Sequence, residues 1–190
     1  MEGIEAERAR LVELLREHSL ILGEVTLASG ASASYYVDAR RTVMRPDGFL
    51  TCGRLIADRA RALGADSVGG PVTAAIPLAC AAIAVPAGAD LRGFFVRNAR
   101  KEHGLQRWIE GATEPGDRVL VVEDTVTTGG STVEAIGRIR EEGFEIAGVV
   151  ALVDRLAGGG EAIAEAADAP FEALSTVDEI YPDRPDRDPG

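Results

Sequence analysis

Two adjacent carboxylates followed by hydroxyls and glycines form the most chemically informative segment of this 190-residue chain. The apolar residues 119–122 predict a strand buried on both faces, and Glu123 and Asp124 follow it directly. Residues 125–132 (TVTTGGST) then open a predicted helix, where backbone N–H groups without partners can hold a phosphate. The carboxylates can accept hydrogen bonds from ribose hydroxyls. The segment therefore predicts a site for a phosphorylated sugar.

Basic side chains gather in residues 97–104, although the whole chain carries a net charge of −11. The groups that can carry positive charge there are Arg97, Arg100, Lys101 and His103. Lys101 is the only lysine in the chain, which suggests that this position needs a flexible ammonium rather than a planar guanidinium. Such cations can stabilise a leaving pyrophosphate. The polar residues 98–112 predict a mobile lid over the substrate, with an ordinary solvated loop as the alternative.

Strands and helices alternate between residues 67 and 153, which predicts a parallel sheet with helices on both faces. Ligands of such sheets bind beyond the carboxyl ends of the strands. Four stretches are expected at those ends and could share one cleft: residues 70–74, 97, 123–131 and 154–155.

The pattern of apolar and turn residues predicts the other elements. Helices are expected at 5–17, 48–63, 73–85, 131–143 and 160–167, and strands at 25–30, 34–38, 67–70, 91–96, 118–122, 146–153 and 171–175. Ser131 and Glu134 have the spacing of a capping box at the start of their helix. A single domain is expected over residues 1–181, and the charged, proline-rich residues 182–190 predict a disordered tail.

Composition argues against several classes of protein. The longest apolar-rich run, residues 74–87, is too short to span a membrane and is broken by Pro77. The charged opening residues, MEGIEAERAR, predict no signal peptide. The net charge of −11 argues against nucleic acids and anionic membranes as partners. Cys52 and Cys80 lie far apart in helical patterns, as expected for reduced residues of a cytoplasmic protein.

The segment 119–132 resembles the signature with which type I phosphoribosyltransferases bind phosphoribosyl pyrophosphate (PRPP). Residues 97–104 (RNARKEHG) resemble the lid sequence R-K-x-x-K-x-H-G of those family members that act on orotate. Residues 25–38 and 70–77 resemble two further elements of the same group, which lie over the base and at the pyrophosphate. The resemblance extends from about residue 10 to residue 175.

This resemblance implies an α/β fold in which helices flank a central, mostly parallel sheet. A small N-terminal hood is expected, formed mainly by residues 19–40 plus the C-terminal strand. The implied reaction transfers the 5-phosphoribosyl group from PRPP to orotate, giving orotidine 5′-monophosphate and pyrophosphate in UMP biosynthesis. Mg²⁺ is the implied cofactor, bound mainly through PRPP without direct protein ligands. A homodimer is implied, in which the lid of residues 98–112 reaches the neighbouring site, so that Lys101 and His103 act in trans.

The resemblance also implies roles for residues that match the family's motifs. Catalytic roles are implied for Lys101, His103 and Asp124. PRPP-binding roles are implied for Arg97, Lys101, His103, Glu123, Asp124, Thr125, Val126, Thr127, Thr128, Gly129, Gly130 and Ser131. Orotate-binding roles are implied for Thr127, Arg155, Tyr35 and Tyr36.

The role of Arg155 has support beyond the resemblance. Because Arg155 follows the apolar strand expected at 146–153, it is expected at the carboxyl edge of the sheet. An arginine can bind a carboxylate through two parallel hydrogen bonds, whereas an ordinary surface turn with Asp154 is the alternative. Tyr35 and Tyr36 could cover the pyrimidine by stacking, or could simply pack within their strand.

Three positions depart from the family's pattern, because Ala28, Ala74 and Asn98 stand where a lysine is frequent. Two other functions therefore stay open. One is phosphoribosyl transfer to a different nucleobase, against which the lid sequence and Arg155 speak. The other is a regulator that binds PRPP without catalysis.

Overall fold

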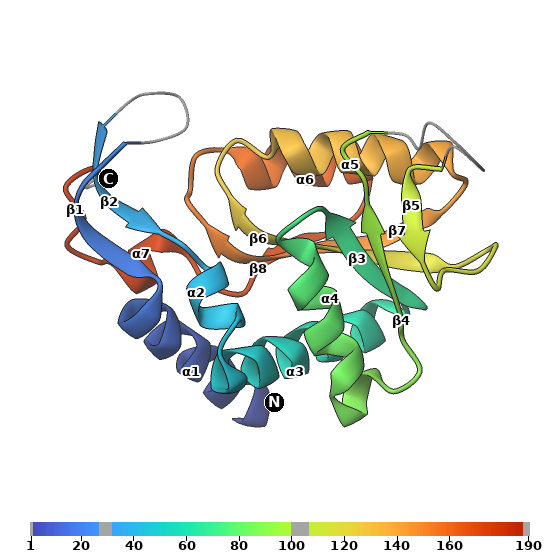
Figure 1. Cartoon of the computed structure of the whole chain (residues 1–190), viewed down its shortest axis with the longest axis horizontal. Coiled ribbons are helices and arrows are strands. Elements are labelled where there is room, and N and C mark those ends of the chain that lie inside the picture. The colour runs from blue at the N-terminus through green and yellow to red at the C-terminus, as the bar shows by residue number, and fades with distance from the viewer. Residues whose placement is uncertain (1, 27–31, 100–106, 188–190) are drawn as a thin grey trace.

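The computed structural model describes residues 2–26, 32–99 and 107–187. Its centre is a six-stranded sheet with the order β5-β4-β3-β6-β7-β8 (Figure 1). Neighbouring strands run parallel except for β5, which is antiparallel to β4. The strands of this sheet are β3 Ser67–Pro71, β4 Arg92–Val96, β5 Ile109–Gly111, β6 Arg118–Val126, β7 Glu145–Asp154 and β8 Phe171–Ala173. The predicted α/β class with a mostly parallel sheet is confirmed.

Helices cover both faces of the sheet, with α5 and α6 on one face and α3 and α4 on the other (Figure 1). The helices are α1 Glu2–His18, α2 Arg40–Val43, α3 Pro46–Leu63, α4 Ala75–Ala84, the short 3₁₀ helix η1 Pro86–Gly88, α5 Gly130–Glu141, α6 Gly159–Ala167 and α7 Val177–Ile180.

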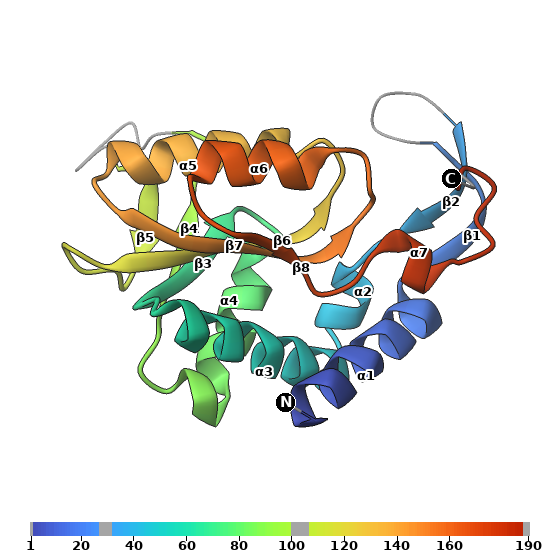
Figure 2. The same ribbon diagram turned by 180° about the vertical axis from the view of Figure 1, so that it is seen from behind.

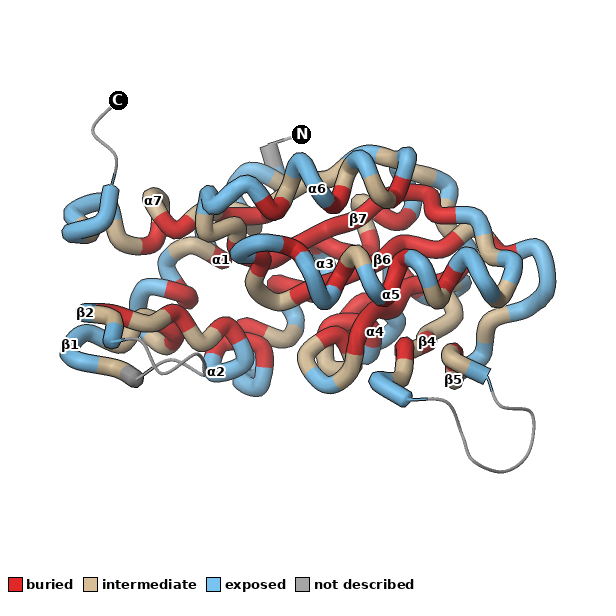
Figure 3. The backbone as a smooth tube through the Cα atoms, turned by 90° about the horizontal axis from the view of Figure 1, so that it is seen from above, coloured by how far each residue is buried: buried red, intermediate tan, exposed pale blue. Residues whose placement is uncertain are grey.

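Strand β6 packs against both helical layers. Val119 and Val121 belong to the core shared with α5 and α6, whereas Leu120 and Val122 belong to the core shared with α3 and α4. Figure 3 shows β6 and β7 buried along most of their length. Burial on both faces explains why this part of the sequence is a continuous apolar run rather than an alternating one.

A separate antiparallel hairpin, the hood, lies at one end of the molecule (Figures 1 and 2). It consists of β1 (Leu20–Thr26) and β2 (Ser32–Val37). Helices α1 and α7 lie beside it and are joined by an ion pair, in which Arg8 Nη2 lies 2.7 Å from Glu179 Oε1. The hood therefore rests on both the first and the last helix of the chain.

The C-terminal region differs from the expectation in two ways. The predicted C-terminal strand is not part of the hood, because β8 pairs with β7 at the edge of the central sheet. Within the predicted disordered tail, residues 182–187 make charge contacts with α7: Arg184 Nε donates to Asp178 Oδ1 at 2.6 Å. Residues 188–190 lie outside the described part of the chain. The segment that joins the hood is thus α7 with residues 181–187, called here the C-terminal segment.

Strand β5 and helix α7 are also absent from the predicted elements, because each is too short to show a repeating apolar pattern. Helix α3 ends as expected at Gly64, which adopts the left-handed conformation with φ 65°. Among the described helices, none is both long and apolar enough to cross a membrane.

Candidate active site

The carboxyl ends of four parallel strands meet at one edge of the sheet, as predicted. Strands β3, β4, β6 and β7 end there, and their last residues are Pro71, Val96, Val126 and Asp154. Backbone bonds join the segments that follow: Val72 N–H donates to Val96 O at 3.0 Å, and Arg155 N–H donates to Val126 O at 2.9 Å. These segments therefore form one continuous edge rather than separate surface loops.

The acidic pair lies within β6 near this edge, because the strand continues to Val126 instead of ending at Val122 as predicted, and Glu123 is only 6% exposed. Thr132 Oγ1 donates to Glu123 Oε2 at 2.9 Å, and Ser131 Oγ donates to the same oxygen at 3.4 Å. Burial, together with repulsion from Asp124, raises the pKa of Glu123 to about 7. The chain therefore holds a carboxylate where two hydroxyl donors only partly offset its desolvation.

Asp124 faces groups from the hood that the sequence did not single out. Burial raises the pKa of Asp124, while the nearby Arg40 guanidinium opposes that shift. Arg40 is the first residue of α2, shortly after β2 ends at Val37, and its Nε donates to Asp38 Oδ1 at 2.7 Å. In the sequence, only the charged residues Asp38 and Arg40 mark this part of the site. Their spacing does not indicate that the end of β2 approaches β6.

The loop between β6 and α5 is held tightly from one side. Gly159 N–H donates to Thr127 O at 3.1 Å, and Gly129 adopts φ +77°. A side chain at Gly129 would place its Cβ 2.9 Å from Gly159 O, so only glycine fits. Between described residues, no hydrogen bond uses the backbone N–H groups of residues 127–129. This arrangement leaves donors at a helix N-terminus for an anion.

The predicted capping box at this helix is wrong. Helix α5 begins at Gly130 with Gly129 as its N-cap, so Ser131 already lies in the first turn. Its hydroxyl points to the carboxylate of Glu123 rather than to the helix backbone, and Glu134 pairs with Arg138 instead. Leaving the buried carboxylate of Glu123 without hydroxyl donors would cost more free energy than leaving the exposed helix end uncapped, because water can solvate the helix end.

The hydroxyl of Thr125, in the predicted PRPP segment, is buried and has no hydrogen-bond partner within the described structure. No group of three His, Cys, Asp or Glu side chains suited to a metal ion occurs in residues 2–26, 32–99 and 107–187.

The structure brings together two of the predicted orotate-binding residues, Arg155 and Tyr35. Arg155 Nη2 donates to Tyr35 Oη at 3.3 Å, and the guanidinium lies 5.3 Å from the centre of the Tyr35 ring. Neighbouring residues of a strand point to opposite faces, so Tyr36 projects away from this contact. Tyr35 is 3% exposed, whereas Tyr36 is half-buried. Of the two tyrosines, Tyr36 is thus the more accessible for stacking on a base.

The prediction of a mobile lid over residues 98–112 is wrong for its last part, because residues 109–111 form β5 and pair with β4. The described residues on either side of positions 100–106 contact α5. Arg138 Nη1 donates to Arg97 O at 2.8 Å, and the Arg138 guanidinium lies 4.4 Å from the centre of the Trp108 ring. Arg97 is directed to Glu110 Oε1 at 3.2 Å. Lys101 and His103 lie outside the described residues, as does Ala28 of the hood, so their predicted roles have no structural description.

The predicted pyrophosphate loop lies between β3 and α4. The peptide bond between Val72 and Thr73 is cis, and Thr73 O accepts from Ile76 N–H at 3.3 Å. Ala74 is the N-cap of α4 and brings no cation to this loop.

The fold and the strand-end loop are those of the type I phosphoribosyltransferase class, and a family model described as "Phosphoribosyl transferase domain" matches residues 46–169. An orotate phosphoribosyltransferase of Corynebacterium glutamicum is 42% identical over 179 residues, which cover 94% of this chain and 96% of the relative. This chain belongs to the orotate phosphoribosyltransferase family.

Solved structures agree with this assignment. The Mycobacterium tuberculosis H37Rv orotate phosphoribosyltransferase in complex with Fe(III) dicitrate is 40% identical, with a TM-score of 0.83 over 92% of this chain and 99% of that chain. The same protein in complex with PRPP has a TM-score of 0.78 at 36% identity, over 92% of this chain and 98% of that one. These similarities establish the fold and the family.

Proposed function

We propose that this chain transfers the 5-phosphoribosyl group from PRPP to orotate in the cytoplasm, as a step of UMP biosynthesis. The products are orotidine 5′-monophosphate and pyrophosphate. The observation that carries this proposal is the position of Arg155: its backbone N–H donates to Val126 O beside the predicted phosphate loop, and its guanidinium donates to Tyr35 Oη. A fixed guanidinium next to a phosphoribosyl site suits a base that bears a carboxylate, and purine bases and uracil bear none.

The residues at the strand ends divide the reaction between them. The free N–H groups of residues 127–129 hold the 5-phosphate, and Glu123 and Asp124 accept hydrogen bonds from the ribose hydroxyls. As the bond between C1 and pyrophosphate breaks, positive charge develops on the ribose, and the two carboxylates stabilise it. Lys101 and His103 stabilise the leaving pyrophosphate, which takes the bonding electrons of the C1–O bond, while orotate N1 bonds to C1 and releases its proton.

Mg²⁺ is the proposed cofactor, as in type I phosphoribosyltransferases that use PRPP. The site fits an ion that arrives with its substrate, because PRPP would supply the direct oxygen ligands while Glu123 and Asp124 would contact the ion only indirectly. The ion would neutralise the negative charge of the pyrophosphate.

The active form is proposed to be a homodimer in which the lid reaches the neighbouring site, whereas residues 109–111 of the predicted range form β5 and stay in the central sheet of their own subunit. An exposed apolar surface on α3, α4 and the preceding turn supports contact with a second copy. Met44 is 72% exposed and Leu50 44%, and both line one shallow apolar hollow together with Pro77 and Cys80 of α4. Large exposed apolar side chains that lie close together are typical of interfaces, since burying them releases water from apolar surface.

The role of Arg155 is tested by comparing Arg155→Ala with Arg155→Lys. Loss of the bidentate clamp should raise the KM for orotate about 10- to 100-fold and change the KM for PRPP much less, because PRPP is held by the other loop. The lysine variant keeps the charge but not the fork and should recover only part of this loss. Initial rates of orotate consumption measure both constants. Equal effects on the two substrates would count against the clamp.

A regulator that binds PRPP without catalysis is the second candidate, favoured by the alanine at position 74 and the asparagine at position 98. Calorimetric binding of PRPP with no orotate consumption at high protein concentration would support it.

A further inference from the structure

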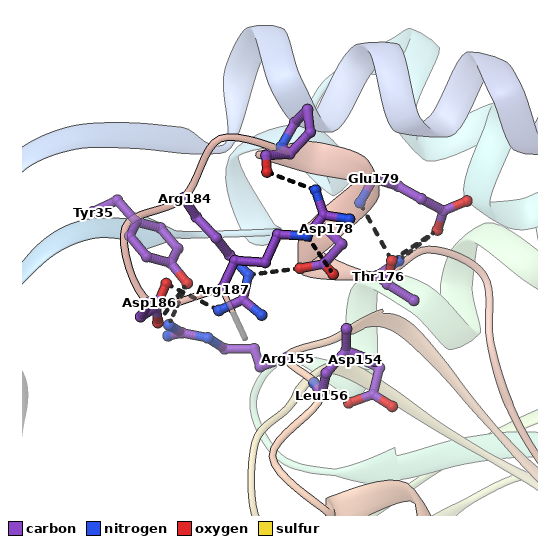
Figure 4. Close-up of polar contacts among 11 residues, drawn as sticks. Tyr35, Asp154, Arg155, Leu156, Thr176, Asp178, Glu179, Arg184, Asp186 and Arg187 are labelled. Atoms are coloured by element: carbon purple, nitrogen blue, oxygen red, sulfur yellow. Dashed lines mark hydrogen bonds and ion pairs between the residues drawn. The ribbon is translucent and has the colours of Figure 1, made fainter. Parts of the chain in front are cut away.

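The C-terminal segment folds back over the hood and covers Tyr35 (Figure 4). The ring of Tyr181 packs edge-on against that of Tyr35, with 5.4 Å between their centres. Arg184 is 10% exposed and bridges two acids, since its Nε donates to Asp178 and its Nη1 lies 2.9 Å from Asp186 Oδ1. Asp186 is thereby held in a defined place although much of its side chain faces solvent.

A chain of hydrogen bonds runs from this segment to the predicted carboxylate clamp (Figure 4). Tyr35 Oη donates to Asp186 Oδ2 at 3.1 Å. The same Tyr35 hydroxyl oxygen accepts a hydrogen bond from Arg155 Nη2 at 3.3 Å. A phenol has a single proton, so donation to Asp186 turns the lone pairs of the hydroxyl toward Arg155. The carboxylate of Asp186 thus determines how Tyr35 receives the guanidinium.

We propose that Asp186 is a positioning residue for the orotate subsite, which acts through the Tyr35 hydroxyl to hold the Arg155 guanidinium ready for the carboxylate of the base. This inference rests on the proposed function, since it assumes that Arg155 binds orotate. Holding a long side chain in its bound conformation strengthens binding because less conformational freedom is lost when the ligand arrives.

Competition is the opposite interpretation, in which the Asp186 carboxylate occupies the place of the ligand. Two observations favour positioning. The nearby Arg184 guanidinium balances the charge of Asp186, and the link to Arg155 passes through a neutral hydroxyl. Orotate can then bind the remaining N–H groups of Arg155 while the hydrogen bond between Arg155 and Tyr35 persists.

The test uses the full chain with Asp186→Ala, Asp186→Asn, Tyr35→Phe and the double variant Asp186→Ala/Tyr35→Phe. Asp186→Ala should raise the KM for orotate about three- to tenfold, with kcat and the KM for PRPP nearly unchanged, because a half-exposed contact contributes modestly. Asp186→Asn keeps an acceptor for the tyrosine and should recover most of the affinity. In the Tyr35→Phe background, Asp186→Ala should add nothing further, since the relay is already broken.

Asp183→Ala is the matched control, because Asp183 is exposed in the same segment and makes none of these contacts. An unchanged KM for orotate in Asp186→Ala would overturn the proposal, and so would a lower one, which would identify the segment as a competitor. Additive effects in the double variant would also contradict it. If the wild-type chain consumes no orotate, the proposed function fails instead, and the two failures are thus distinguishable.

Discussion

Glu123 shows how one residue of the site links stability to function. Its carboxylate is buried at the end of a strand, and its two hydroxyl partners do not fully replace water. A group whose folded-state pKa is raised binds its proton more tightly in the folded chain than in the unfolded chain. The free energy of unfolding should therefore fall as the pH rises from the ordinary carboxylate range through about 7.

Glu123→Gln should remove this pH dependence, because the amide cannot ionise but can still accept a hydrogen bond from Thr132. Relative to the wild type, we expect the variant to gain on the order of 1–2 kcal/mol of stability between about pH 5 and about pH 8. Urea unfolding of both proteins at the two pH values measures this difference. If the stability difference between the two proteins does not change with pH, ionisation of Glu123 does not destabilise the free protein, which contradicts the prediction.

At the scale of elements, the β6–α5 loop depends on the start of α6. Gly129 and Gly159 approach closely, and the backbone of Gly159 fixes the carbonyl of Thr127. A loop held from behind in this way can direct its N–H groups outward to a phosphate without first having to order itself. Packing between α5 and α6 therefore determines the geometry of the anion site.

Replacing Gly129 by alanine should destabilise the chain by about 1–3 kcal/mol, because the position combines a positive φ with a contact too short for Cβ. PRPP affinity should fall at the same time. Gly137→Ala is the control, since Gly137 lies in α5 with open space around it and alanine there should stabilise the helix by about 0.5–1 kcal/mol. Thermal unfolding and PRPP titration test both variants; similar results for the two would refute the packing argument.

Elements that depend on local pattern could be predicted from the sequence, whereas those that depend on distant partners could not. Buried β6 and the place of Arg155 followed from apolar runs and from the geometry of parallel sheets. The prediction of a capping box was wrong because the Ser131 hydroxyl donates to the carboxylate of Glu123, eight residues away. The contacts of residues 182–187 are made by Arg184 and with Tyr35 on the hood, and neither contact has a signature in a charged, proline-rich stretch.

At the scale of the whole molecule, the proposed site needs parts from two places. One part is the strand-end edge, with Asp124 and Arg155. The other is the segment that contains Lys101, which is anchored on α5 through Arg138 at both of its described ends. In the proposed homodimer these parts come from different subunits, so each site should fail when either subunit is defective.

Mixing Lys101→Ala with Asp124→Asn tests this arrangement, because each variant alone should be nearly inactive. After subunit exchange, half of the dimers are mixed and each contains one intact site if the lid acts in trans, so about a quarter of wild-type activity should return. Light scattering should confirm that the mixture is dimeric. If the lid acts within its own subunit, no activity returns.

Orotate consumption shows whether this site joins orotate to the ribose of PRPP. With PRPP and Mg²⁺ present, the absorbance of orotate should fall as one pyrophosphate is released for each orotate used. Hypoxanthine, adenine and uracil should neither replace orotate nor compete with it, because none offers Arg155 a carboxylate. Transfer to one of those bases with no loss of orotate would contradict the account.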